Sequence, residues 1–266
     1  MANNSKQEPL LQLRSKIDEI DDKLINLLGQ RIELVKEVGE YKKSINESFF
    51  VKSAREADMI KNLLLKANKS IPKSTIVNIW RKLIASANAL EQDLKIAIFN
   101  PSNIADYQYL VREYYGDFIA FTQGADSSQI LSDIENNHAQ IAVFAVENDS
   151  INQNIWWQYL AKNHCKIKIF ARIPFIGSSP YQLFVAAIKA PEKSQNDQTL
   201  AVVSDFDAAQ LTSNKSALKC RIMQSKAGFS LIEIDGFFQE GDEKIAILNA
   251  KIIGHFAHPI SLDEIG

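Results

Sequence analysis

An unbroken helical pattern near the start of this chain limits its fold more than any other feature. Nothing interrupts the pattern before Ser44–Ser48, so we predict one helix of about 35 residues and roughly 50 Å. A stripe that long must be buried against long partners, from its own chain or from another one. Its apolar residues recur at steps of three or four: Leu10, Leu13, Ile17, Ile20, Leu24, Leu27, Leu28, Leu34, Val35 and Val38.

Two further helices are predicted before residue 94. Ser53 and Glu56 have the spacing of a capping box, which predicts a helix start at Ser53. After Ile71-Pro-Lys-Ser74 the chain restarts, and apolar residues from Ile76 to Leu90 predict a third helix. The predicted N-terminal domain is therefore all-α, with a long, a short and a long helix.

The rest of the chain has a different texture, because its apolar residues gather in short runs typical of strands in an α/β or α+β region. We predict a multi-domain protein with domains at residues 1–93, 94–191 and 192–266, and a polar linker within 191–198. The runs are Lys95–Asn100, Gln140–Val146, Lys166–Ile173, Gln182–Ile188, Thr199–Val203 and Phe229–Phe238.

Charge and composition exclude several classes of function. A formal net charge of -2 gives no reason to expect nucleic acid. The polar start lacks the apolar core of a signal peptide, and the apolar runs are too short for a membrane helix. Cys165 and Cys220 form no CxxC motif, which favours a cytoplasmic protein without a disulfide framework or a zinc site.

Two cations lie within the apolar stripe of the first helix. Arg31, Val35, Val38 and Lys42 follow the spacing of one face, so the two cations lie roughly 16 Å apart. Either cation alone could simply extend its stem out of the core. Several cations beside one apolar seam would instead form a pocket for a small polyanion. Arg14 lies about 25 Å before Arg31, so it could reach the same ligand only from another chain.

These residues resemble the chorismate mutase domain of the AroQ type over about residues 8–93. The segments that carry the resemblance are Leu10-Leu-Gln-Leu-Arg14-Ser-Lys-Ile-Asp18-Glu-Ile-Asp21, Leu27-Leu-Gly-Gln-Arg31, Val35-Lys-Glu-Val-Gly39-Glu-Tyr-Lys42 and Arg55-Glu56. The resemblance implies an intertwined homodimer with shared active sites. It also implies the rearrangement of chorismate to prephenate, which needs no cofactor and no metal. The enzyme must hold a flexible dianion in a compact conformer and stabilise charge on the breaking ether oxygen.

The resemblance also assigns roles to the cations and to Glu56. Arg14 would bind a substrate carboxylate in the partner's site, and Arg31 a carboxylate in the site of its own chain. Lys42 would lie near the ether oxygen. Arg55 would support the other carboxylate, and Glu56 would bind the substrate hydroxyl.

The third helix departs from the family's pattern at the contacts to the ether oxygen. Glu91 occupies the place of the usual glutamine, with Gln92 next to it, and Asn88 stands beside the place of a common serine. Glu91, Gln92 and Asn88 therefore all remain candidates for this contact. An ionised glutamate would oppose charge on the oxygen, so we expect activity to fall as pH rises. A connecting-loop position that is usually acidic holds Lys52.

The second half resembles a shortened prephenate dehydratase. The segment from Ile141 to Ser150, which includes Glu147-Asn148, is similar to a strand of that family, although any strand–helix–strand unit could show this pattern. Gln182 and Leu183 occupy the places of the family's threonine and arginine, which predicts an inactive relative.

Residues 198–258 resemble an ACT-like regulatory domain, with strands at 199–204, 218–223, 229–238 and 251–257 and helices at 206–217 and 241–249. The family's ligand loops are absent, so an aromatic amino acid effector is an expectation without a motif. Two rival functions stay open: a bifunctional chorismate mutase/prephenate dehydratase, and a non-catalytic regulatory protein that binds an aromatic amino acid.

Overall fold

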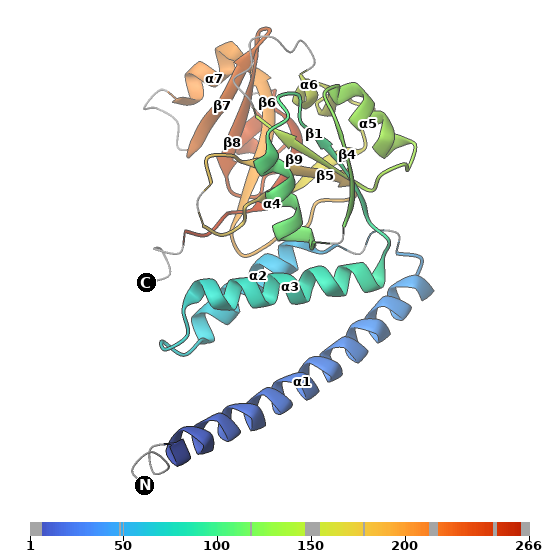
Figure 1. Ribbon diagram of the computed structural model, residues 1–266. Coiled ribbons are helices and arrows are strands. Elements are labelled where there is room, and N and C mark those ends of the chain that lie inside the picture. The colour runs from blue at the N-terminus through green and yellow to red at the C-terminus, as the bar shows by residue number, and fades with distance from the viewer. Residues whose placement is uncertain are drawn as a thin grey trace. The chain divides into compact units, whose positions relative to one another are not determined.

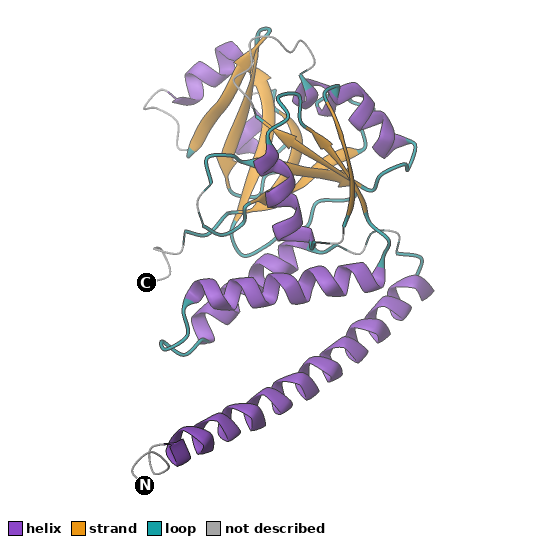
Figure 2. Cartoon of the chain, in the orientation of Figure 1, coloured by secondary structure: helices purple, strands orange, loops and turns teal. Residues whose placement is uncertain are grey.

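The computed structural model describes residues 7–47, 49, 51–117, 119–146, 155–177, 179–212, 218–246 and 249–261. The chain forms two compact units, each with its own internal contacts. One unit is Met1–Phe50 with Leu90–Gln92, and the other is Val51–Ala89 with Asp93–Gly266. Figure 2 shows helices in both units and strands in the second unit alone.

The first unit consists mainly of helix α1, Gln7–Ser44, which confirms the predicted long helix (Figure 1). Lys42 and Lys43 lie in its last turn, where cations favour the negative end of the helix dipole. The helix ends where the Ser44 hydroxyl donates to the Tyr41 carbonyl and Asn46 takes a positive φ of 56°. In the chain alone its apolar stripe is exposed, with Leu13 58% and Ile17 56% accessible.

Helix α2, Ser53–Lys66, and helix α3, Lys73–Glu91, confirm the second and third predicted helices. The predicted capping box at Ser53 is wrong. The residue at the cap is Lys52, which makes no side-chain cap. The Ser53 hydroxyl instead donates to the Phe170 carbonyl at 2.7 Å, because α2 packs against strands β4 and β9 of the sheet. The Ser53 hydroxyl therefore makes a tertiary hydrogen bond instead of the local cap that the sequence pattern predicts.

The second unit is built on one mixed sheet of nine strands, in the order β2-β1-β3-β5-β4-β9-β6-β8-β7. The strands are β1 Lys95–Phe99, β2 Ala120–Gly124, β3 Ile141–Ala145, β4 Ile167–Ile173, β5 Leu183–Ile188, β6 Asp197–Ser204, β7 Cys220–Lys226, β8 Phe229–Asp235 and β9 Lys251–Ala257. The helices that accompany them are α4 Ala105–Tyr115, α5 Ser127–Glu135, α6 Trp156–Leu160, α7 Asp205–Thr212 and α8 Glu243–Ala246.

The first five strands and the helices between them form an α/β arrangement that directly follows the helical segment in the sequence. Strands β2, β1 and β3 are parallel, whereas β5 pairs antiparallel with both β3 and β4. The predicted runs at β1, β3, β4 and β5 are confirmed as strands. Strand β2 was not predicted, because it is a short edge strand with mostly exposed side chains and a polar half, Thr122-Gln-Gly124.

The last four strands and two helices follow the order strand, helix, strand, strand, helix, strand, as the ACT-like pattern predicts. Strands β9, β6, β8 and β7 are antiparallel neighbours. The sheet is continuous between the two halves, since Ile169 of β4 pairs in parallel with Gly254 of β9. The domain boundaries at 93/94 and 191/192 stay predictions.

The predicted linker is shorter and more ordered than its polar composition suggests. Asp197 and Gln198 belong to β6 and are buried. The backbone N–H and the hydroxyl of Ser194 both donate to the Asp197 carboxylate, with the hydroxyl at 2.6 Å. These hydrogen bonds close a short loop that leads the chain into β6. Among the described residues, no helix combines the length and the apolar character that crossing a membrane requires.

Candidate active site

In the first unit, a lysine from α1 and a glutamate from the end of α3 form an ion pair. Lys42 Nζ lies 2.5 Å from Glu91 Oε2, and the two side chains are only 12% and 8% exposed. A charge pair so well removed from water interacts more strongly than a surface pair. The structure therefore brings together two residues that the sequence assigned to the ether oxygen.

Gly39, one turn before Lys42, makes room for this pair. A Cβ at Gly39 would lie 3.3 Å from the Glu91 Cγ, which is tighter than ordinary packing. The other glycine of α1, Gly29, has nothing within 4 Å of the same position. The two helical glycines therefore differ, and only Gly39 is needed for a close approach.

The arginines of α1 lie far from each other along one straight helix. Arg31 is half-buried and Arg14 is exposed. Their separation of 17 residues corresponds to about 25 Å of helix rise. One small ligand cannot contact both arginines of the same chain.

In the second unit, Glu56 of α2 is buried and bound from two sides by α3. Arg81 Nη1 donates to its Oε2 at 3.2 Å, and Asn88 Nδ2 donates to its Oε1 at 3.1 Å. Arg55, the neighbour of Glu56, is exposed. The structure therefore groups Glu56 with Asn88 but not with Arg55.

Arg81 is the residue of this group that the sequence reasoning missed. A signal was present, because Val77, Arg81, Ile84 and Asn88 follow the same four-three-four spacing that singled out Arg31 and Lys42. In the structure only 7% of Arg81 is exposed.

Aromatic rings complete the surroundings of Arg81. Its guanidinium carbon lies 4.3 Å from the centroid of the Tyr114 ring, a cation–π stack. Burial raises the pKa of the Tyr114 hydroxyl to about 12, although the Arg81 charge opposes this. Burial also disfavours the charge of Arg81, but Tyr114 and Glu56 outweigh it, so the pKa of Arg81 is raised. The guanidinium therefore stays charged at any physiological pH.

The remaining departures from the family's pattern have structural partners. Lys52, at the position expected to be acidic, pairs with Glu192 at 3.0 Å. Of the three candidates for the ether oxygen, Glu91 contacts Lys42 and Asn88 contacts Glu56. The assignments of Glu91, Gln92 and Asn88 to the substrate stay predictions.

The dehydratase-like region contributes no comparable cluster at the predicted positions. Leu183 is fully buried in β5, and the side-chain oxygen of Gln182 accepts a hydrogen bond from Arg221 at 3.5 Å. Residues 147–150, which carry the Glu-Asn-Ser pattern, lie outside the described residues. Within the described part of the chain, no three His, Cys, Asp or Glu side chains are grouped as metal ligands.

Comparison with known proteins identifies the helical segment. Residues 13–92 match the family described as chorismate mutase type II. The bifunctional chorismate mutase/prephenate dehydratase of Aquifex aeolicus is 30% identical over 146 residues, which cover 53% of this chain and 40% of the relative. The corresponding protein of Pseudomonas aeruginosa is 25% identical over 148 residues, which cover 54% and 40%.

The chain spans about 40% of the length of these curated relatives. A solved prephenate dehydratase from Streptococcus mutans matches with a TM-score of 0.37 and 16% identity, over 63% of this chain and 100% of that one. The predicted resemblance to a helical chorismate mutase is confirmed by the family match over residues 13–92.

Proposed function

We propose that this chain is a chorismate mutase, which rearranges chorismate to prephenate in phenylalanine and tyrosine biosynthesis. The observation that carries the proposal is the buried pair of Lys42 and Glu91, 2.5 Å apart, inside the segment that matches the mutase family. The reaction needs a fixed positive charge where the breaking ether oxygen becomes negative. Lys42, whose position is fixed by its contact with Glu91, supplies that charge when Glu91 is protonated.

Two arginines of α1 are proposed to bind the substrate carboxylates. Arg31 would act in the site of its own chain, and Arg14 in the site of a second chain, because about 25 Å of helix separates them. A planar guanidinium binds a carboxylate through two parallel hydrogen bonds, which fixes both position and orientation. Together the two arginines would hold the substrate in its compact, reactive conformer.

Glu91 is proposed to act on the ether oxygen together with Lys42. Protonated, its carboxyl donates a hydrogen bond to the oxygen; ionised, it neutralises Lys42 and opposes the developing charge. Activity should therefore be present where Glu91 is protonated and lost where it is ionised. The pairing with Lys42 favours Glu91 over Asn88 and Gln92 for this role.

The remaining roles rest on the resemblance to the family. Arg55 is proposed to support a substrate carboxylate, and Glu56 to accept a hydrogen bond from the substrate hydroxyl. Asn88, which donates to Glu56 at 3.1 Å, would then orient that carboxylate.

We further propose that the protein is a homodimer whose two active sites are each built from both chains. Exposed apolar side chains along α1 support this, because a stripe of this length is unfavourable in water. An interface along α1 would bury the stripe and would also carry Arg14 into the site of the partner.

For the tail we propose a role other than dehydration. Gln182 and Leu183 supply neither a hydroxyl nor a guanidinium where the dehydratase pattern has them. Binding of an aromatic amino acid effector to this region remains a proposal. The described cysteines, Cys165 and Cys220, are free thiols, which fits the reducing cytoplasm that we propose as the compartment.

The purified full-length chain, incubated with chorismate, tests this function. We expect loss of chorismate and formation of prephenate. A parallel incubation with prephenate should yield no phenylpyruvate above the acid-catalysed background. Phenylpyruvate there would favour the bifunctional rival, whereas unchanged chorismate would favour the non-catalytic regulatory protein.

A further inference from the structure

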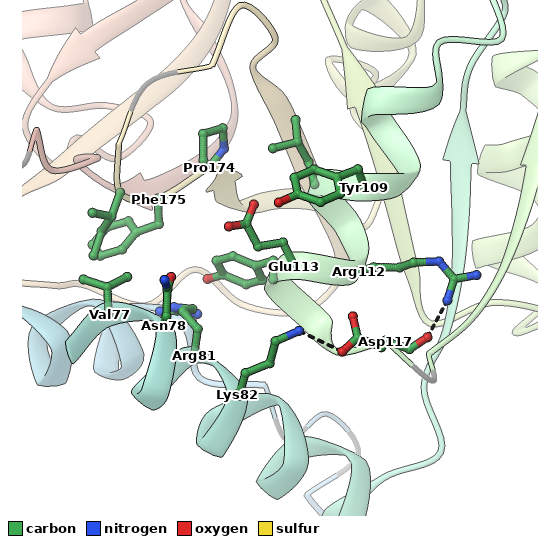
Figure 3. Close-up of a pocket in the computed structure, with 13 residues that line it drawn as sticks. Val77, Asn78, Arg81, Lys82, Tyr109, Arg112, Glu113, Asp117, Pro174 and Phe175 are labelled. Carbon is green, nitrogen blue, oxygen red and sulfur yellow. Dashed lines mark hydrogen bonds and ion pairs between the residues drawn. The ribbon is translucent and has the colours of Figure 1, made fainter. Parts of the chain in front are cut away.

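A cavity of about 400 Å³ lies on the second unit, outside the residues assigned to the mutase reaction. It is bounded by α3, by α4 and by the segment that follows β4 (Figure 3). One wall is apolar and is formed by Val77, Leu110, Pro174, Phe175 and Ile176. The size and the wall suit a small molecule with an apolar body.

Arg81 lines this cavity and has hydrogen-bonding capacity to spare. Its Nη1 donates to Glu56, and its side chain also interacts with the Tyr114 hydroxyl, but Nε and Nη2 are buried and make no hydrogen bond of ordinary geometry among the described residues. A buried donor without an acceptor costs free energy, of the order of 1–3 kcal/mol in proteins generally. Two such donors on one side chain therefore point to a missing acceptor.

The geometry of the guanidinium defines that acceptor. The N–H groups of Nε and Nη2 lie side by side on one edge of the plane and form a fork that matches the two oxygens of a carboxylate. Tyr114 covers a face of the plane, at 4.3 Å from its centroid, and Phe175 lies 5.8 Å away. Stacking on a face leaves the donors in the plane free, so the edge is the part of Arg81 that can still bind.

The other charged groups of the cavity leave room for an anion. Lys82 pairs with the Asp117 carboxylate at 2.9 Å, and Arg112 donates to the Asp117 carbonyl. Glu113 is the other acid of the lining, and it is exposed. A carboxylate on Arg81 would thus meet a lining that carries three cations and two acids.

We propose that this cavity binds a small organic carboxylate, whose carboxyl group pairs with Nε and Nη2 of Arg81 and whose apolar body packs on Phe175 and Pro174. Because both donors are buried, entry requires rotation of a rim side chain. Asn78, an exposed residue one turn before Arg81, is placed to do this. Binding at this cavity would be separate from the mutase function and would not depend on turnover.

Calorimetric titration of the full-length chain with 3-phenylpropanoate, and with the uncharged 3-phenylpropanamide, tests the proposal. The acid and the amide share a body and differ in the group that Arg81 would bind. We expect the acid to bind at least about tenfold more tightly than the amide. Equal affinities, or no binding of the acid up to about 10 mM, would overturn the proposal.

Variants locate the site. Asn78→Trp should abolish binding by filling the mouth of the cavity, whereas Ser86→Trp, on the same face of α3 but outside the lining, should not change it. Arg81→Lys keeps a positive charge beside Glu56 but removes the fork, and should weaken binding of the acid about tenfold or more. Wild-type affinity in Asn78→Trp would contradict the assignment even if Arg81→Lys failed to fold. Each of these binding outcomes can be read whether or not the chain shows chorismate mutase activity, which is measured separately.

Discussion

Helix α1 and the nine-stranded sheet differ in whether their apolar side chains are buried within the single chain. Along α1 the apolar side chains are exposed in the single chain, as Leu24 shows with 51% of its surface accessible. In the sheet, Ile98 and Val143 are completely buried. The sheet is therefore stabilised within its own chain, whereas the stripe of α1 would be buried by the second chain that we propose. Since Arg31 and Lys42 lie on α1, the proposed chemistry depends on the region whose apolar side chains are exposed in the single chain.

Gly254→Ala tests the self-sufficiency of the sheet and should have the largest effect. A Cβ at this position would lie 2.2 Å from the Ile169 carbonyl oxygen, so β4 and β9 could not stay paired. We expect the free energy of unfolding to fall by more than about 3 kcal/mol, as measured by denaturant titration. Gly29→Ala in α1, where nothing lies within 4 Å, should instead stabilise the chain by about 0.5–1 kcal/mol. Equal effects of the two substitutions on the free energy of unfolding would contradict this difference in packing between the sheet and α1.

Lys42→Ala should reduce kcat by about a hundredfold or more, with a much smaller effect on KM. Its charge meets an oxygen that becomes negative only in the transition state, and its loss also leaves the buried Glu91 without this partner. Lys43→Ala, which removes an exposed neighbouring cation, should change kcat by less than about twofold. A change in KM alone would remove Lys42 from the ether oxygen.

Glu91→Gln should flatten the dependence of activity on pH. An amide donates a hydrogen bond at any pH, whereas the carboxyl donates only when protonated. The wild-type chain should therefore lose activity as pH rises, and the variant should not. Profiles of kcat/KM from about pH 5 to about pH 9 decide the matter. Superimposable profiles would show that Glu91 takes no part in the reaction.

Gly39→Ala should have the smallest effect, a several-fold loss of kcat with the fold intact. The new methyl group would lie 3.3 Å from the Glu91 Cγ and would displace the carboxylate from Lys42 by a few tenths of an ångström. Small misplacements of catalytic groups are costly, at about a hundredfold for a full ångström. Gly29→Ala is the matched control, because it adds the same methyl group to the same helix. Equal kcat values for the two variants would show that the close approach at Gly39 has no role.

The elements that could be predicted are those whose spacing of apolar residues shows directly which side chains form an apolar face. The stripe of α1 and the apolar runs of β1, β3 and β4 needed no tertiary information. Strand β2 was not predicted, because this exposed edge strand has no apolar run. The capping box failed because the Ser53 hydroxyl bonds to Phe170, 117 residues away in the sequence.

The residues of the candidate site likewise include some that the sequence predicted and one that it did not. The spacing and the family resemblance singled out Lys42, Glu91, Glu56 and Asn88, whose roles in the reaction stay predictions. Arg81 was missed, because its role depends on Tyr114 and Phe175, which come from distant segments. Sequence patterns thus found the residues that one helix presents, and they failed where several elements converge on one side chain.

The most direct test of the account is to mix chains that carry Arg14→Ala with chains that carry Arg31→Ala. Each variant alone should be nearly inactive, since every site of its homodimer lacks one arginine. In a mixed dimer both defects fall in the same site, and the other site is intact. Random exchange of subunits should therefore restore about a quarter of the wild-type activity. If the mixture stays inactive after proven subunit exchange, the two arginines do not meet across a dimer of α1 helices.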